Sequence, residues 1–233
     1  MQALDLYGEI QEYLDFEDEI EALYRATLLE VIQKEPKTLI DIGCGQGEFC
    51  NIVEHNGITT LGVDLSQIQI DLAQQKFPNL SFKAIGIADI AQKYDCATAT
   101  FDVINYIPKS QLKAFFESTN KTLHKNGYFI FDINTLFGFE EIAQGTLIID
   151  EEDTFIGIDA NFEDNILYTD MTLFTKENSC YNKQKGTIKQ YFHPTKELQL
   201  LLEECGFVVE KSVDFSLHSE DDNDKMILVC KKQ

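Results

Sequence analysis

A short apolar run, a glycine-rich turn and a helical segment follow one another over residues 38–49, and this order constrains the fold most strongly. Thr38 to Ile42 predicts a buried strand that carries one carboxylate, Asp41. Glycines then occupy every second position, and helix-permitting residues resume at Glu48. Such a turn exposes backbone N–H groups at a helix N-terminus to a closely approaching ligand. The glycines are Gly43, Gly45 and Gly47.

A second apolar run supports a ligand role for the glycine turn, which by itself could also be an ordinary tight turn. This run, residues 59–63, ends in Asp64, twenty-one positions after Gly43. An acidic residue at the tip of the second parallel strand binds ribose hydroxyls in nucleotide-binding βαβ units. Ser66 and a helical run over residues 67–76 follow. The sequence therefore predicts a nucleoside-containing ligand.

The glycine spacing separates two families of nucleotide-binding protein. A dinucleotide fingerprint aligned on Gly43 and Gly45 requires glycine at position 48, where this chain has Glu48. The pattern Asp-x-Gly-x-Gly-x-Gly, followed by Asp64, instead resembles class I S-adenosylmethionine-dependent methyltransferases. The resemblance covers about residues 36–233. It implies an α/β fold with a Rossmann-like, mostly parallel sheet, an antiparallel last strand, N-terminal helices and an inserted antiparallel β flap.

The resemblance also implies S-adenosyl-L-methionine as the cofactor and S-adenosyl-L-homocysteine as its product. The glycine loop is expected under the methionine part, with Asp41 near its amino group and Asp64 on the ribose. For the adenine, one alignment gives the acid position to Asp89 and the ring contact to Ile90. A rival alignment puts Ile87 at the acid position and leaves Asp89 on the surface. The predicted cofactor residues are Asp41, Gly43, Cys44, Gly45, Gly47, Asp64, Leu65, Asp89, Ile90, Thr100 and Tyr13.

The N-terminal residues 1–35 are expected to form a helical cap over the cofactor site. Apolar positions recur there at helical spacing, with a break near residues 15–18. In the resembling family such helices carry a tyrosine toward the cofactor. Tyr7 and Tyr13 are the candidates, and a plain packing role is the alternative for each.

The acceptor is expected where the fourth strand, residues 94–101, runs into residues 102–108, because ligands bind beyond the carboxyl ends of parallel strands. The sequence Thr-Phe-Asp-Val-Ile-Asn-Tyr-Ile resembles a bacterial small-molecule branch of the family, including sugar-amine N-methyltransferases, which often have histidine where Tyr106 stands. Asp102 and Asn105 are alternatively residues that only cap and shape this loop. The fifth strand, residues 128–134, ends beside them in Asp132 and Asn134.

An inserted antiparallel flap is predicted over residues 146–193. Strands are expected at 154–162, 166–174 and 187–192, with turn residues at 178–186. An amine acceptor would have to lose its proton to Tyr106, His193, Asp102 or water. The predicted catalytic residues are Tyr106, Asp102 and His193, and the predicted acceptor contacts are Asn105, Tyr106, Asn134, Tyr168 and Tyr191.

Charge restricts the acceptor. The chain has forty acidic and nineteen basic residues, a net charge of −21, and a single arginine, Arg25. Nucleic-acid and anionic-membrane partners are therefore disfavoured. Residues 126–170 contain eleven carboxylates and no Lys, Arg or His, which would attract cationic or neutral molecules. The expected function is methyl transfer to an N or O nucleophile of such a small molecule, with an RNA-modifying enzyme or a non-catalytic S-adenosylmethionine-binding protein as alternatives.

The remaining features predict one methyltransferase domain over residues 1–233, as a monomer or homodimer. No apolar stretch is long enough to span a bilayer, and the acidic N-terminus lacks signal-peptide character, so a cytoplasmic location is expected. The six cysteines contain no Cys-x-x-Cys pair, so reduced thiols are expected rather than a metal site or a disulfide framework.

Overall fold

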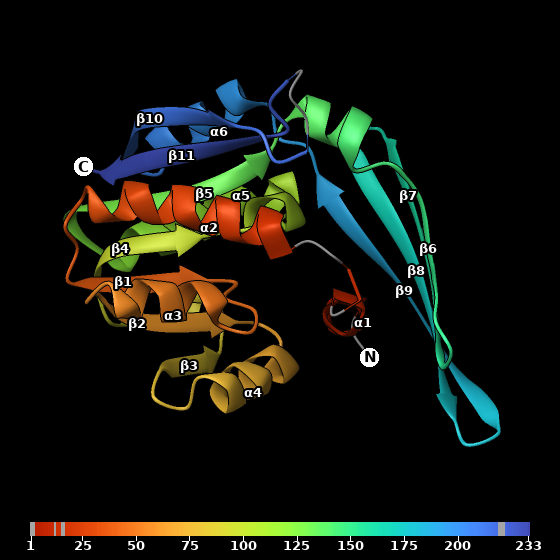
Figure 1. The fold of residues 1–233 in the computed structure, drawn as a ribbon. Coiled ribbons are helices and arrows are strands. Elements are labelled where there is room, and N and C mark those ends of the chain that lie inside the picture. Colours follow the sequence, from red (N-terminus) through yellow and green to blue (C-terminus); the bar gives the residue numbers. More distant parts are fainter. Residues whose placement is uncertain (1–2, 12, 15–16, 219–221) are drawn as a thin grey trace.

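Two β-sheets make up the protein in the computed structural model, which describes residues 3–11, 13–14, 17–218 and 222–233 (Figure 1). The larger sheet has seven strands and helices on both faces, and the smaller has four antiparallel strands. The first five strands of the larger sheet alternate with helices along the chain. In chain order these elements are β1 (Thr38–Ile42), α3 (Glu48–His55), β2 (Thr59–Asp64), α4 (Gln67–Lys76), β3 (Ser81–Ala84), η1 (Ile87–Asp89), β4 (Tyr94–Ala99), η2 (Val103–Tyr106), α5 (Lys109–Lys121) and β5 (Leu123–Asn134).

The larger sheet has the strand order β10-β11-β5-β4-β1-β2-β3. Its last part is α6 (Thr195–Glu204), β10 (Phe207–Phe215) and β11 (Lys225–Lys232). The strands β1 to β5 are parallel, and β11 enters antiparallel between β5 and β10. This confirms the predicted fold class. The order reverses between β1 and β4, so a ligand crevice is expected beyond their carboxyl ends.

Both faces of the larger sheet are buried, which is why its strands read as nearly continuous apolar runs. On one face Phe116 and Phe129 pack with α5 and α6. On the other face Leu39 and Ile130 pack against α3 and α2 (Glu17–Ile32). The buried polar groups Asp41, Thr98 and Asp132 lie toward the carboxyl ends of β1, β4 and β5.

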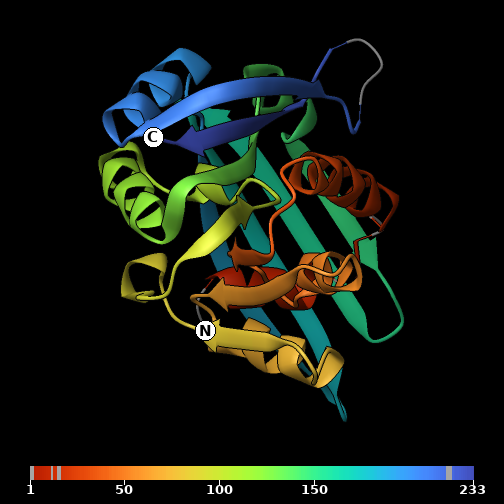
Figure 2. The same ribbon diagram turned by 90° about the vertical axis from the view of Figure 1, so that its left-hand side faces the viewer.

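The smaller sheet, which we call the flap, consists of β6 (Gly145–Asp150), β7 (Thr154–Glu163), β8 (Ile166–Glu177) and β9 (Cys180–Tyr191). It follows η3 (Gly138–Ile142), and the parallel strands of the larger sheet point toward it (Figure 1). In Figure 2 the flap strands cross behind the larger sheet. The helix α1 (Ala3–Gln11) lies between the two sheets and contacts β9 and α4.

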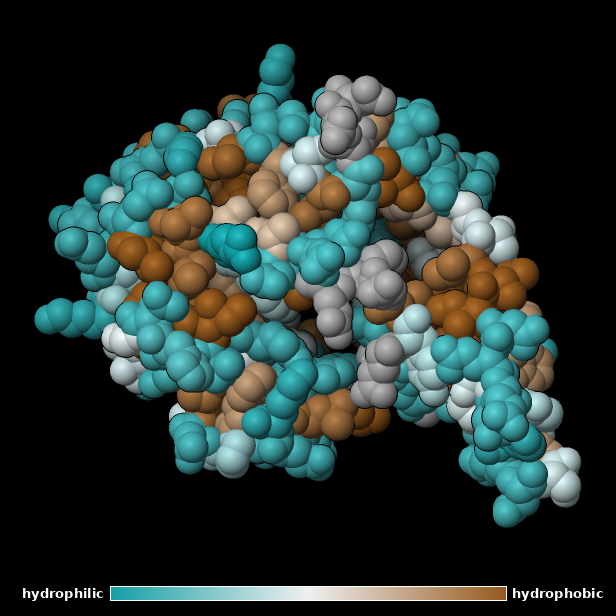
Figure 3. All heavy atoms as spheres, viewed as in Figure 1, coloured by the Kyte–Doolittle hydropathy of each residue, from teal (hydrophilic) through white to brown (hydrophobic). Residues whose placement is uncertain are grey.

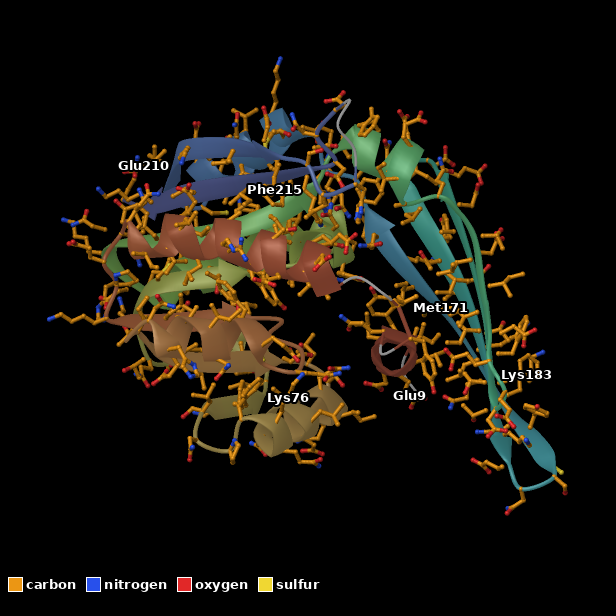
Figure 4. All side chains as sticks on the ribbon, viewed as in Figure 1. Glu9, Lys76, Met171, Lys183, Glu210 and Phe215 are labelled. Atoms are coloured by element: carbon orange, nitrogen blue, oxygen red, sulfur yellow. The ribbon has the colours of Figure 1, made fainter. Side chains whose placement is uncertain are left out.

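One face of the flap is apolar and packs against α1. Leu6 and Ile10 of α1 contact Ile156, Met171 and Ile188 in one buried cluster. Figure 4 shows Met171 on the α1 side of the flap and Lys183 on the opposite side. The apolar face thus holds α1. The other face, which we call the outer face, carries charged and polar side chains together with the ring pair Phe155 and Phe174.

The flap is longer than the sequence predicted. Residues 178–186 were expected to form a turn, but β9 begins at Cys180 and pairs with β8 along its whole length. The strand β6 was not predicted, because most of its residues are exposed and it has no buried face to impose an alternating pattern. Hydrophilic side chains cover the hairpin end of the flap (Figure 3).

Some predicted element boundaries differ from the observed ones by a few residues. The strand β5 begins at Leu123 rather than Tyr128. The predicted break near residues 15–18 lies partly outside the described residues. None of the helices in the described part of the chain has the length and apolar character needed to cross a bilayer.

Candidate active site

The glycine turn after β1 leaves open space at one position. Gly43, Gly45 and Gly47 have φ of 72°, 52° and 86°, which side chains rarely adopt. A Cβ on Gly43 would lie 2.7 Å from a Val103 methyl carbon, and one on Gly47 would lie 2.5 Å from the Phe82 ring. Nothing lies within 4 Å of a Cβ on Gly45. Two glycines therefore permit close packing, and the central one offers bare backbone to a ligand.

Asp64 lies at the tip of β2 and faces this turn. Its Oδ2 accepts a hydrogen bond from the Gly45 N–H at 3.0 Å, and its Oδ1 accepts one from the Ser66 N–H at 2.8 Å. Each carboxylate oxygen has a second lone pair, so both can still accept from a vicinal diol. The carboxylate is half-buried, and these two local bonds hold its orientation.

The next residues form an apolar edge beside Asp64. The Leu65 side chain is 78% exposed and lies close to Gly86. Asp89 is exposed and also approaches Gly86, while Ile90 is half-buried against the core. Ile87 is buried in the main core, so its side chain is turned away from a ligand. The adenine contact of Asp89 and Ile90 stays a prediction, as does the rival alignment, which also leaves Asp89 on the surface.

Asp41 is buried below the glycine turn. Its Oδ1 accepts a hydrogen bond from the Thr98 hydroxyl at 2.7 Å, and its Oδ2 lies 3.5 Å from the Cys50 thiol. Burial raises the pKa of Asp41 to about 7. Thr100 is buried just after β4, on the same face as Thr98 by alternation. The Cys44 side chain points into the core with Cys50, so only its backbone can line the crevice.

A tyrosine that the sequence did not indicate, Tyr24 of α2, lies beside the residues that flank the glycine turn. Its ring packs on Phe49 and Phe101 at centroid distances of 5.2 and 5.8 Å. Burial and the nearby carboxylates of Glu48 and Asp41 raise its pKa well above the usual value. The predicted tyrosine, Tyr13, instead places its hydroxyl 3.5 Å from Thr154 at the start of β7, so the structure does not bring it to the turn.

A buried ionic cluster lies at the carboxyl ends of β4 and β5, where the sequence predicts the acceptor. Lys225 Nζ donates to Asp102 Oδ1 at 2.8 Å, to Asp132 Oδ2 at 3.1 Å and to Asn134 Oδ1 at 2.8 Å. Gln190 of the flap donates to Asp102 Oδ2. Burial would lower the pKa of Lys225, but the two carboxylates outweigh it and raise that pKa, so the lysine is charged.

This cluster corrects the prediction for Asp102. Both of its carboxylate oxygens already accept hydrogen bonds within the protein, and the side chain is buried. It is therefore not a free base that could take a proton from an amine. The sequence analysis did not predict Lys225 and Gln190 as site residues, because the sequence around each gives only a weak indication of such a role. The clue for Lys225 is that an antiparallel last strand begins at the edge where the parallel strands end.

Asn105 and Asn134 also serve the protein itself. Asn105 is fully buried, donates to the Tyr191 carbonyl at 2.9 Å and accepts from the Asn134 N–H at 2.9 Å. The Asn134 side-chain oxygen is bound to Lys225. These bonds agree with the alternative that such residues shape the loop, rather than with direct acceptor contacts.

Two tyrosines meet near this cluster. Tyr106 of η2 packs against the α1–flap core beside Tyr7 of α1. Burial, the Asp102 carboxylate and Tyr7 raise the pKa of Tyr106 well above its usual value. Burial and Asp102 raise the pKa of Tyr7 to about 12. Both phenols therefore keep their protons at neutral pH and are hydrogen-bond donors.

The remaining predicted residues lie away from the cluster. His193 is 4% exposed, its Nε2 lies 3.0 Å from the Ile107 carbonyl, and burial lowers its pKa, so it is neutral and enclosed. Tyr168 lies under the Lys189 ammonium, 5.1 Å from it, on the outer face of the flap. The Tyr191 side chain points to the face opposite Gln190 by alternation. The structure thus does not bring Tyr168, Tyr191 and Asp102 to one pocket.

Comparison with known proteins decides the family. The family model for a methyltransferase domain matches residues 16–212. This chain belongs to that family. It is 24% identical over 199 residues to YqeM of Bacillus subtilis, named as a methyltransferase, covering 81% of each chain.

Solved structures show the same fold. An S-adenosylmethionine-dependent methyltransferase from Clostridium acetobutylicum superposes with a TM-score of 0.82 at 19% identity, over 97% of this chain and 99% of that one. CalS10, an amino pentose methyltransferase from Micromonospora echinaspora solved with S-adenosylmethionine bound, gives a TM-score of 0.71 at 13% identity, over 100% and 98% of the two chains.

The protein is thus a class I S-adenosylmethionine-dependent methyltransferase, and its residues fit that cofactor. Gly45 would leave room for the methionine part, Asp64 would offer two oxygens to the ribose, and Leu65 would offer an apolar surface to the adenine. When bound, the cofactor supplies a methyl group on a sulfonium, an electrophile with a neutral leaving group. The protein has to bind and align the two reactants. Within the described residues no cluster of His, Cys, Asp and Glu is arranged to hold a metal ion.

Proposed function

We propose that this methyltransferase acts on an amine, or secondarily a hydroxyl, of a small neutral or cationic molecule. The observation that carries this is the charge of the acceptor end, where two buried carboxylates, Asp102 and Asp132, face one ammonium, Lys225. The surplus negative charge favours a cationic or polarised donor group and disfavours a carboxylate. The acidic composition of residues 126–170 acts in the same direction.

Proton removal does not need a dedicated side chain in this proposal. Asp102 is bound on both oxygens, His193 is enclosed, and Tyr106 keeps its own proton. The nucleophile has to be unprotonated, and an amine that loses its proton to water before it is aligned with the methyl group meets this requirement. The hydroxyls of Tyr7 and Tyr106 can then orient the acceptor. We therefore expect the rate to rise with pH up to the pKa of the acceptor amine itself.

The test is transfer of a radiolabelled methyl group to matched acceptors that share one scaffold: an amino sugar, its hydroxy counterpart and its carboxylate counterpart. We expect the amine to be methylated fastest, the hydroxyl more slowly and the acid not at all. Methylation of the acid alone would refute the charge argument. Cofactor binding with no transfer to any acceptor in a broad panel would point to the non-catalytic alternative, and salt-sensitive methylation of RNA would point to the RNA-modifying one.

A further inference from the structure

The turn between β4 and η2 is strained and lies where donor and acceptor must meet. Phe101 and Asp102 have φ of 61° and 50°, so two successive residues with side chains adopt the left-handed region. Val103, the residue that follows, packs against Gly43 of the cofactor loop. The same turn therefore borders the methionine end of the cofactor site and begins the acceptor segment.

Side-chain bonds from one buried group of residues, which we call the Lys225 cluster, hold this turn. The Asp102 N–H donates to Asp132 Oδ2 at 3.0 Å, and Lys225 bridges the carboxylates of Asp102 and Asp132. The Lys225 ammonium also lies over the Phe101 ring, 5.6 Å from its centroid. One ammonium thus contacts both strained residues and the strand beside them. The cluster consists of Lys225, Asp102, Asp132, Asn134 and Gln190.

The cluster also connects the turn to the flap. Gln190, near the end of β9, donates to the second carboxylate oxygen of Asp102. One residue later, the Tyr191 carbonyl accepts from Asn105 of η2 at 2.9 Å. Two adjacent residues of the flap are therefore bound to the acceptor segment. A change in the position of Asp102 would be transmitted to the flap and, through its apolar face, to α1.

We propose that Lys225 is a positioning residue for methyl transfer, which acts through Asp102 to hold the strained turn and to set the flap against the acceptor segment. It does not touch the reacting atoms. The proposal rests on methyl transfer as the reaction and is independent of which acceptor is used. The competing explanation is that Lys225 only balances buried charge, in which case any variant that restores the balance would be fully active.

The test compares Lys225→Met with the double variant Lys225→Met, Asp102→Asn. The double variant removes one positive and one negative charge, so the cluster keeps its original net charge. Asparagine also tolerates the left-handed backbone at position 102. We expect the single variant to lose thermal stability and the double variant to regain most of it. Lys232→Met is the matched control, because Lys232 lies on the same strand and donates to the carbonyls of Asn120 and Leu123 at the far end of β5.

Amide hydrogen exchange gives a measurement that needs no acceptor. In both Lys225 variants, peptides from residues 100–107 and 180–191 should exchange faster, while S-adenosylhomocysteine binding by calorimetry should change less than about threefold, since the cofactor end has its own contacts. With an acceptor found in the panel above, kcat should fall by about 10- to 100-fold with little change in KM for the cofactor. The control should show neither change.

Two outcomes would overturn the proposal. A double variant that regains both stability and wild-type kcat would show that Lys225 only balances charge. Unchanged exchange in residues 180–191 of the single variant would show that the flap is not coupled to the cluster. If no acceptor is found, the exchange and binding measurements still decide the coupling, so failure of the acceptor hypothesis remains a separate result.

Discussion

The cofactor end and the acceptor end of the crevice are held by contacts of very different range. At the cofactor end, Asp64 is bound by Gly45, nineteen residues away, and by Ser66, two residues away. At the acceptor end, Asp102 is bound by Lys225 and Gln190, which are 123 and 88 residues away. The Asp64 carboxylate is therefore held within one βαβ unit and the turn that follows it. The arrangement at the acceptor end exists only when the last strand has paired with β5 in the larger sheet and Gln190 of the flap has reached Asp102.

Because of this difference, a substitution can disrupt the structure of one end and leave the other end intact. A local βαβ unit can keep its geometry when distant contacts are lost, whereas a buried ionic group depends on every member being present. Substitutions at the acceptor end should therefore affect folding first, and substitutions at the cofactor end should affect binding first.

The largest expected effect is on the stability of Lys225→Met. Removing the ammonium leaves Asp102 and Asp132 buried without a cation, which should lower the free energy of unfolding by about 3–5 kcal/mol. Urea denaturation of the apo protein measures this loss. Asp64→Ala serves as the comparison and should cost under about 1 kcal/mol, because Asp64 is only half-buried. Equal losses for the two variants would remove the distinction between the ends.

The next effect is on cofactor affinity. Asp64→Ala should weaken S-adenosylmethionine binding by about 1–3 kcal/mol, because buried ribose hydroxyls lose their acceptor and the Gly45 N–H loses its partner. Calorimetry with the cofactor and with its demethylated product measures this. Asp71→Ala, on the exposed side of α4, is the control and should bind normally. Unchanged affinity in Asp64→Ala would contradict the assignment of the ribose site.

A third effect is a pH dependence of stability that comes from Asp41 at the cofactor end. The pKa of Asp41 is about 7 in the folded protein, against 3.8 for an ordinary aspartate. Between about pH 4 and pH 7 the folded state holds a proton that the unfolded chain has lost, so this group's contribution to stability falls as pH rises. The contribution is fully present below about pH 4 and is lost above about pH 7.

Asp41→Asn should therefore make the apo protein more stable than wild type at pH 8, by about 1–2 kcal/mol, and not at pH 4. Thermal melts at the two pH values check the sign. The same variant should bind S-adenosylmethionine more weakly at pH 8, because a carboxylate near the cofactor's amino group is lost. A stability gain that is the same at both pH values would show that the carboxyl is not protonated in the folded protein.

The smallest expected effect separates the two faces of the flap. Tyr168→Ala, on the outer face, should cost under about 1 kcal/mol of stability through the lost contact with Lys189 and should leave acceptor KM and kcat unchanged. Tyr7→Phe, on the α1 side near Asp102, should alter acceptor KM with little effect on stability. A Tyr168 variant with impaired acceptor KM would restore the role that the sequence predicted for it.

The amino-acid sequence was enough to predict the parallel sheet, the glycine turn and the position of Asp64 at a strand tip. Their information is local, because an apolar run, a glycine spacing and an acid at the next strand tip need no distant partner to be interpreted. The N-terminal helices and the existence of an inserted antiparallel segment were predicted for the same reason. The match of the methyltransferase family model to residues 16–212 agrees with that part of the prediction.

The orientation of the flap, the length of β9 and the role of Asp102 depend on contacts between distant parts of the chain. Alternation showed that Tyr168 shares a face with its neighbours, but not which face meets α1, since that depends on the helix packed against the sheet. The polar residues of β9 form a strand because β8 supplies their hydrogen bonds, not because of their own propensity. Asp102 became a buried member of an ion cluster rather than a free base, because Lys225 reaches it from the opposite end of the chain.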